Sequence, residues 1–274
     1  MLSTRDIRRK IRTVQNIQQI CKAMKTVASV KLRKAEERYR HAQPYAGALR
    51  RVVASLGGVQ AGHPLLETRE VKRSGVVAIS ADKGLAGSYN ASIVREAVAL
   101  ARSVGDVGVA PIGRRINDAF RRLGFTMEGG LSPLGSEPEY RGIAALADHI
   151  GNLYIQGVWD RVYLVYHRFG ERVVTEQLLP IESLGEEAGG DFIFEPSPAI
   201  ILEQLLPRYL RTLLFTAVLS AAAAEHAARV AAMALASDNA EDVIDTLTMD
   251  YNKSRQAAIT RELGDIVGAS EAMR

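Results

Sequence analysis

The spacing of apolar residues predicts a long helix at the start of the chain. A seam of mostly apolar or small residues alternates spacings of four and three. Its members are Ile7, Ile11, Val14, Gln18, Cys21, Lys25, Ala28 and Leu32, flanked by a second stripe of Ile17, Ile20, Met24 and Val27. This is the heptad-like pattern of a helix that pairs with another, although Gln18 and Lys25 interrupt it. Because glycine is absent before Gly47, we expect one helix from about 3 to 56, with room for a bend at Pro44.

The middle of the chain alternates short apolar runs with amphipathic segments. Strands are expected at 75–80, 106–113, 161–169, 172–180 and 192–196, and helices at 92–102, 116–124 and 140–155. Strands that alternate with helices predict an α/β domain with a mainly parallel sheet. The tight turn at Gly170 predicts an antiparallel hairpin late in that sheet.

The last segment predicts a second long helix. From Arg208 to Leu263 neither glycine nor proline occurs, while Pro196, Pro198 and Pro207 crowd its start. These 56 residues would form a rod of roughly 84 Å at 1.5 Å per residue. Eleven of the twenty residues at 217–236 are alanine, so the rod should be slim and helix-favouring. We expect it to pair with the N-terminal helix in an antiparallel coiled coil.

The predicted fold class is therefore α/β, with a long antiparallel coiled coil of the N- and C-terminal helices and a central Rossmann-like domain. The expected divisions are an N-terminal coiled-coil helix at 1–57, the α/β domain at 58–200 and a C-terminal coiled-coil helix at 201–274.

Charge is unevenly distributed along the 274 residues, although the net charge is only +4. Residues 1–35 hold ten lysines or arginines and a single acid, Asp6, so this end should seek an acidic partner. The most apolar window, 213–224, is shorter than the ~20 residues that span a bilayer, and no secretory signal is visible, so we expect a soluble chain. With one cysteine, Cys21, no internal disulfide can form.

The candidate chemistry is sparse. The loop ADKGLAGSYN at 81–90 follows a predicted strand, but it lacks the spacing of a phosphate-binding Walker loop, and Gly84 and Gly87 better suit a tight turn. The five histidines are scattered. No aromatic residue precedes Tyr39, which disfavours single-stranded nucleic acid. The residues alone leave three alternatives: a nucleotide-binding protein with helical arms, a coiled-coil nucleic-acid adaptor, and a protein adaptor.

Three motifs narrow these alternatives. IRRKIRTVQNIQQICKAMKTVASVKLRKAEE at 7–37 closely resembles the N-terminal signature of F-type ATP synthase gamma subunits, and SADKGLAGSYN at 80–90 is similar to the family's central loop. The stretch 224–273 resembles the C-terminal signature nearly throughout. The motifs cover both ends and the middle in the family's order.

The resemblance implies a central rotor stalk that is itself non-catalytic and binds no cofactor or metal. Its coiled coil would enter a ring of alternating alpha and beta subunits (three each), and its α/β domain would sit on the epsilon subunit and the membrane c-ring. Such a subunit transmits torque between ion flow and ATP synthesis or hydrolysis. It would lie peripherally on the cytoplasmic face of a bacterial plasma membrane.

The same resemblance implies which residues contact beta. The matching positions are Lys22, Met24, Lys25, Lys83, Arg255, Gln256, Thr260 and Glu262. The lysines would meet an acidic lever segment of beta, and Arg255 and Gln256 would bond transiently to a catch loop. Cys21 stands where the family usually has threonine, and the cysteine pair of chloroplast members is missing, which excludes their thiol switch. The alternative, non-functional interpretation of the 251–274 segment is a solvated, frayed tail.

Overall fold

A computed structural model describes residues 4–55, 63–181 and 197–272. The chain forms two compact units. The helix-pair unit consists of Met1–Ala28 and Arg229–Arg274, and the α/β unit is Ser29–Ala228. The helices α1 (Thr4–Ser55) and α5 (Pro198–Ala272) each contribute to both units. The strand expected at 192–196 lies outside the described residues, and the three-part division at 57 and 200 stays a prediction.

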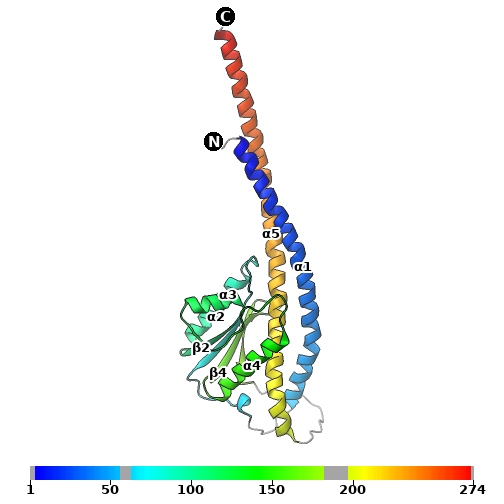
Figure 1. The fold of residues 1–274 in the computed structure, drawn as a ribbon, viewed down its shortest axis with the longest axis vertical. Helices are drawn as coiled ribbons and strands as arrows, with labels where there is room; N and C mark the ends of the chain where they lie inside the picture. Colours follow the sequence, from blue (N-terminus) through cyan, green and yellow to red (C-terminus); the bar gives the residue numbers. More distant parts are fainter. Residues whose placement is uncertain (1–3, 56–62, 182–196, 273–274) are drawn as a thin grey trace. The chain divides into compact units, whose positions relative to one another are not determined.

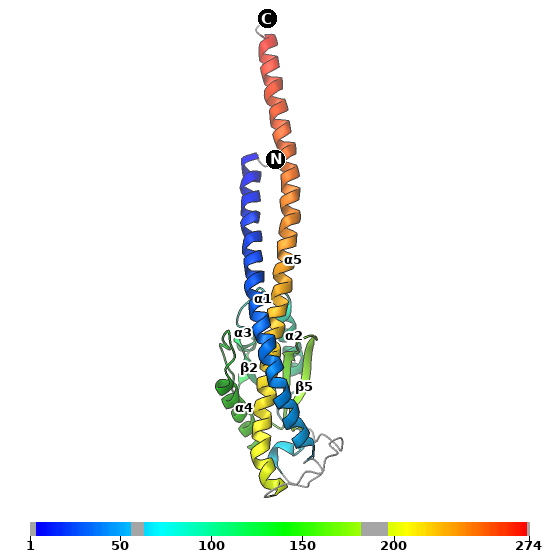
Figure 2. The same ribbon diagram turned by 90° about the vertical axis from the view of Figure 1, so that its right-hand side faces the viewer.

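The helix-pair unit is antiparallel, as expected from the seam. Arg8 donates a hydrogen bond to the Tyr251 hydroxyl at 2.6 Å, and Gln18 donates to Glu241 at 3.4 Å. The residue numbers of each pair add to the same total, so the register is constant along the unit. By this register Thr4 lies level with Arg255, and α5 continues as a single helix beyond the start of α1 (Figures 1 and 2).

The predicted seam is largely confirmed, with one shift. Ile7, Cys21 and Ala28 are buried, but between the last two it is Met24 that is half-buried, while Lys25 points outward. Positions 24 and 25 lie on either side of the line from Cys21 to Ala28 on the helix surface, and the apolar Met24 is the one that packs. In the flanking stripe Met24 is half-buried, whereas Ile17, Ile20 and Val27 are exposed.

The α/β unit is built on a five-stranded sheet. Its strands are β1 (Ser74–Ile79), β2 (Val107–Ile112), β3 (Thr126–Met127), β4 (Arg161–His167) and β5 (Val173–Leu179), in the order β3-β2-β1-β4-β5. The pairs within β3-β2-β1-β4 are parallel and β4–β5 is antiparallel, so the mainly parallel sheet and its late hairpin are confirmed.

Helices cover both faces of this sheet (Figure 1). On one face, α2 (Tyr89–Ser103) and α3 (Arg114–Arg122) pack with Val76 and Ala78 of β1. On the other, α4 (Tyr140–Ile155), α5 and α1 pack with Val77 and Ile79. Because successive residues of a strand face opposite ways, β1 is buried along its whole length, as its continuous apolar run predicted.

Two elements escaped prediction, and the last helix starts earlier than expected. The 3-10 helix η1 (Pro64–Leu66) and the two-residue strand β3 have no clear sequence pattern. The last helix begins at Pro198, ahead of its expected start, and runs through Pro207 to Ala272. Proline removes one helical hydrogen bond, but Leu206 and Leu210 on either side of it are buried in the core, which stabilises the helix across it.

The apolar content of α5 belongs to a core helix. By length and composition its stretch Ala199–Gly264 passes for a membrane span, with a mean hydropathy of 1.2 in its most apolar window. Half of that window is buried inside the protein. The alanine run contributes to this burial: Ala217, Ala221, Ala223 and Ala224 all lie in the interior of the α/β unit.

Candidate functional site

The first group of candidate contact residues shares one turn of α1 in the helix-pair unit. Lys22 and Lys25 are exposed, and Met24 between them is half-buried in the seam. The backbone carbonyl of Lys22 accepts a hydrogen bond from the Thr26 hydroxyl at 3.1 Å. The structure therefore places two cationic side chains beside a partly accessible thioether on a single rigid turn.

The charges of α5 differ along its length, and this distinguishes Lys22 and Lys25 from Arg9, Lys10 and Arg12. The stretch 238–250 has five acids and no base: Asp238, Glu241, Asp242, Asp245 and Asp250. By the register of the pair it lies opposite residues 9–21 of α1, where three basic residues fall. Lys22 and Lys25 lie level instead with 230–237 of α5, a stretch without any charged residue. The acidic stretch of α5 therefore lies level with Arg9, Lys10 and Arg12, and not with the exposed side chains of Lys22 and Lys25.

The second group lies on α5 from the level of Thr4, where the described part of α1 begins, onward. The seam of α5 comprises buried or half-buried residues at heptad-like spacing, namely Met233, Ser237, Ala240, Ile244, Leu247, Tyr251 and Ser254. Beyond it Arg255, Gln256, Thr260 and Glu262 are all exposed. The Thr260 hydroxyl donates to the Gln256 carbonyl at 3.0 Å, a bond internal to the helix. At 1.5 Å per residue, Arg255 lies about 27 Å along the helix from the level of Lys22. The two groups are therefore separate sites on one rod.

Large apolar side chains are exposed along both helices of this unit. Their exposed fractions run from 45% to 66%. They are Ile17, Ile20 and Val27 of α1 and Leu235, Val243, Met249, Ile259, Leu263 and Ile266 of α5. Scattered exposed leucines are ordinary, but a rod with this many along its length indicates a surface that another protein covers.

Lys83 belongs to the α/β unit, in the loop between β1 and α2. Its side chain is exposed, while its backbone is held in place by Asn90. The Asn90 side chain accepts from the Ala81 amide and donates to the Lys83 carbonyl, both at 3.1 Å. Gly87 has a φ of +56°, which confirms the turn predicted for it, and Leu85 also adopts a left-handed φ of +62°. A loop fixed in this way presents Lys83 from a rigid base.

Sequence reasoning missed Asp82, the residue that anchors this loop. Its carboxylate accepts backbone N–H bonds from Arg114 at 2.9 Å, Leu134 at 3.1 Å and Gly135 at 2.8 Å. These donors come from the start of α3 and from the loop before α4. A carboxylate is favoured at a helix N-terminus, where free amides and the helix dipole point toward it. Only the three-dimensional meeting of these loops identifies the role, because the donors are backbone groups.

A second polar cluster lies behind the same loop, where α2 meets β4. His167 stacks on Tyr89, with ring centroids 4.9 Å apart, and lies 3.1 Å from the Ser92 hydroxyl. Burial lowers the pKa of His167 below its ordinary value. Tyr89 also donates to the Ala221 carbonyl of α5 at 2.9 Å, which ties α2 to α5. Within the described ranges, no three His, Cys, Asp or Glu side chains gather as a metal site requires.

Comparison with known proteins gives one consistent family. A family model described as ATP synthase matches residues 3–273. The ATP synthase gamma chains of Heliobacterium modesticaldum and Desulforamulus reducens are 41% and 42% identical to this chain, and each alignment covers all of both proteins. The gamma chain of Xanthomonas axonopodis pv. citri is 38% identical, again over the full length of both.

Solved structures agree with the fold. The central stalk and c-ring structure of the Tetrahymena thermophila mitochondrial ATP synthase contains a chain with 26% identity and a TM-score of 0.63, over 80% of this chain and 99% of that one. A chain in the Euglena gracilis mitochondrial ATP synthase has a TM-score of 0.71 at 20% identity, over 98% of this chain and 94% of that one, and it supports the fold alone. From the full-length matches to curated relatives and to the family model, the chain belongs to the ATP synthase gamma chain family.

Proposed function

We propose that this chain is the central rotor subunit of an F-type ATP synthase, a non-catalytic part that transmits torque. It would couple ion translocation through a membrane c-ring to ATP synthesis or hydrolysis on the beta subunits and so regulate their ATPase activity. The observation that carries the proposal is the helix-pair unit, a rod with exposed apolar side chains on both helices. Such a rod suits a close-fitting sleeve made by other subunits.

The expected partners follow from this role. They are alpha and beta subunits (three each) around the rod, and an epsilon subunit and c-ring at the α/β unit. The solved relatives belong to rotor, F1 and c-ring assemblies, which supports membership of a membrane ATP synthase. The chain would lie on the cytoplasmic face of a bacterial plasma membrane, held there through the complex. The family relationship gives no support to a nucleic-acid or general protein adaptor.

The proposed beta contacts divide by chemistry. Lys22 and Lys25 provide concentrated positive charge for an acidic lever segment, with Met24 as the apolar contact between them. Lys83 would add one cation from a rigid loop. Arg255 and Gln256 offer directional hydrogen bonds on the exposed surface of α5 near its C-terminal end, with Thr260 and Glu262 nearby. A rotor should bind no angle too tightly, so few such bonds on a mainly apolar rod agree with rotation.

The first test is a tagged pull-down from detergent-solubilised native membranes at low salt, with ATPase activity assayed in the eluate. We expect alpha, beta and epsilon chains to co-purify with ATPase activity. If the intact tagged chain recovers no ATPase and no such subunits, while an alpha-tagged control recovers the whole enzyme without this chain, the rotor assignment is wrong.

The lever contact is tested by Met24→Lys in the assembled enzyme. A third positive charge in the same turn should disturb the contact and lower the ions pumped per ATP hydrolysed, with little loss of assembly. Gln15→Lys is the matched control, because Gln15 is exposed on the opposite face of α1 and gains the same charge. Unchanged pumping per ATP in Met24→Lys would remove Met24 from the contact.

The catch contact is tested by the double substitution Arg255→Ala with Gln256→Ala. Both residues are exposed, and alanine is the better helix former, so α5 should persist while ATP turnover falls. The control replaces Asn252 and Lys253, an exposed amide and cation of the same helix, by alanine. Equal turnover in the two double variants, at full assembly, would argue against a specific contact at Arg255 and Gln256.

A further inference from the structure

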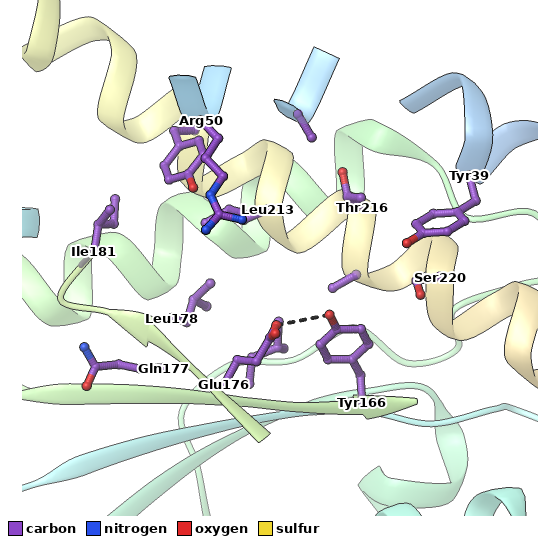
Figure 3. A pocket seen from close by; sticks show the side chains of 14 residues that line it. Tyr39, Arg50, Tyr166, Glu176, Gln177, Leu178, Ile181, Leu213, Thr216 and Ser220 are labelled. Atoms are coloured by element: carbon purple, nitrogen blue, oxygen red, sulfur yellow. Dashed lines mark hydrogen bonds between the residues drawn. The ribbon is translucent and has the colours of Figure 1, made fainter. Parts of the chain in front are cut away.

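A cavity of about 400 Å³ lies within the α/β unit, between the two long helices and the edge of the sheet. Its walls come from α1, β4, β5 and α5 (Figure 3). The volume falls in the lower part of the range of small-molecule sites, roughly 300 to 1,000 Å³. None of the residues assigned to the beta contacts lines it, so it lies apart from the proposed rotor contacts.

One side of this cavity is apolar. Leu164 of β4, Leu178 of β5, and Leu213 and Ala217 of α5 supply aliphatic surface, and Ala46 of α1 leaves space opposite them. In Figure 3 Leu213 and Leu178 face one another across the cavity. A chain or ring of carbon atoms placed there would be removed from water on several sides, which is the main source of affinity in such sites.

Most polar groups of the cavity already have partners. The Glu176 carboxylate pairs with Arg168 and accepts from the Tyr166 hydroxyl at 3.1 Å, as the dashed line in Figure 3 marks. The Ser220 hydroxyl accepts from the Phe169 amide at 2.9 Å. The negative charge of Glu176 is thus compensated within the protein, so the cavity does not call for a cationic ligand.

Two further polar groups, Arg50 and Thr216, bear on which ligand the cavity could bind. The Arg50 guanidinium extends from α1 toward Leu213 and Leu178 (Figure 3), and no ion pair joins it to any residue in the described part of the chain. The Thr216 hydroxyl is buried without a hydrogen-bond partner among the described residues. Thr216 also lines a second cavity of about 510 Å³. A buried hydroxyl without a partner is unfavourable in an empty cavity. Arg50 lines the cavity and is exposed, so its guanidinium can meet the acceptor oxygens of a ligand that enters.

We propose that this cavity binds a small amphiphilic monoanion, a carboxylate carried on an apolar chain or ring. The apolar part lies against Leu164, Leu178 and Leu213. The carboxylate accepts from the Arg50 guanidinium, whose planar fork matches two carboxylate oxygens. Because its walls belong to both long helices and to β5, an occupied cavity joins the three elements more firmly and raises the melting temperature of the α/β unit.

The direct test titrates the purified full-length chain with decanoate below its micelle concentration, by calorimetry. We expect saturable binding at one site and a rise in melting temperature. Decanol and decyltrimethylammonium have the same chain with a neutral or a cationic head, and each should bind roughly tenfold or more weakly, since neither forms the charge-assisted bond. Equal binding of all three, or no saturation with decanoate, overturns the proposal.

Variants locate the site. Arg50→Gln removes the proposed anion partner and should weaken decanoate binding by roughly tenfold or more. Arg51→Gln is the matched control, because it removes the same charge from the next residue of α1, which is exposed and does not line the cavity. Ala46→Phe should abolish binding by filling the cavity. Circular dichroism and the melting temperature of each unliganded variant establish that it is folded. An equal loss in Arg51→Gln, or full binding in Ala46→Phe, places the anion elsewhere and refutes the proposal.

Discussion

The loop that carries Lys83 depends on a single carboxylate, and Asp82→Ala should therefore destabilise the α/β unit. The substitution removes the acceptor of three backbone amides while leaving the loop sequence otherwise intact. The amides of Arg114 and Gly135 are exposed, so water can replace their bonds, whereas the bond from Leu134 is partly buried.

The expected loss can be estimated from these three bonds. A hydrogen bond to a charged group contributes about 1.5–3 kcal/mol when it is shielded, and an exposed one contributes roughly 0.5–1 kcal/mol. One partly buried and two exposed bonds give a loss of about 2.5–5 kcal/mol for Asp82→Ala. Asp82→Asn keeps the oxygen that serves Arg114 and Leu134 and places an amide group toward Gly135, so it should lose about half as much.

The loss of stability is measured by urea denaturation of the full chain, with the fluorescence of Trp159 as the signal. That residue is the only tryptophan and is fully buried in the α/β unit, so its signal reports on this unit. Asp118→Ala is the control, because Asp118 is an exposed carboxylate of α3. If Asp82→Ala lost no more stability than Asp118→Ala, the three-amide anchor would contribute nothing and the reasoning would be refuted.

Three further outcomes are expected. Gly108→Ala should cost about 1–3 kcal/mol in urea denaturation, because a Cβ there would overlap the Glu128 carboxylate. Because burial lowers the pKa of His167, the unfolded chain binds more protons than the folded chain near pH 6.5. The stability contributed by neutral His167 should therefore be full above that pH and fall as the pH drops toward the lowered pKa. His167→Gln should flatten the resulting slope of melting temperature against pH. Ala28→Leu should lower the melting temperature of the helix-pair unit by overpacking its seam, measured by circular dichroism, whereas the exposed Ala23→Leu should leave it nearly unchanged.

Periodic elements were predictable from the sequence. The helix at 140–155 and the positions of the four longer strands along the chain follow from periodicity and turn residues, because burial of a repeating face is recorded in local spacing. The family resemblance added the candidate contacts at Lys22 and Arg255, which no spacing indicates. It also directed attention to Lys83, but not to Asp82 beside it.

The features that could not be predicted depend on groups distant in sequence. The role of Asp82 lies in the backbone amides of residues 114, 134 and 135, and backbone groups leave no trace in the residue types. The exposure of Ile17 and Ile20 could not be predicted from spacing. Their sequence pattern is that of core residues, because an apolar helix face has the same spacing whether it packs on its own chain or on another protein. Likewise the acidic stretch of α5 is seen to balance the basic start of α1 only once the register is known.

The alanine run at 217–236 has two uses, and the boundary between the units divides them. Up to Ala228 it belongs to the α/β unit, where Ala221 and Ala224 are buried and the small side chains let α5 approach α2 closely enough for Tyr89 to reach the Ala221 carbonyl. From Arg229 it belongs to the helix pair, where only every third or fourth residue is buried and the helix stays slim. An alanine-rich sequence therefore does not by itself indicate the helix of a rotor subunit. What supports the proposed contact at Lys22 and Lys25 is that both side chains are exposed and lie level with 230–237, a stretch of α5 without acidic residues.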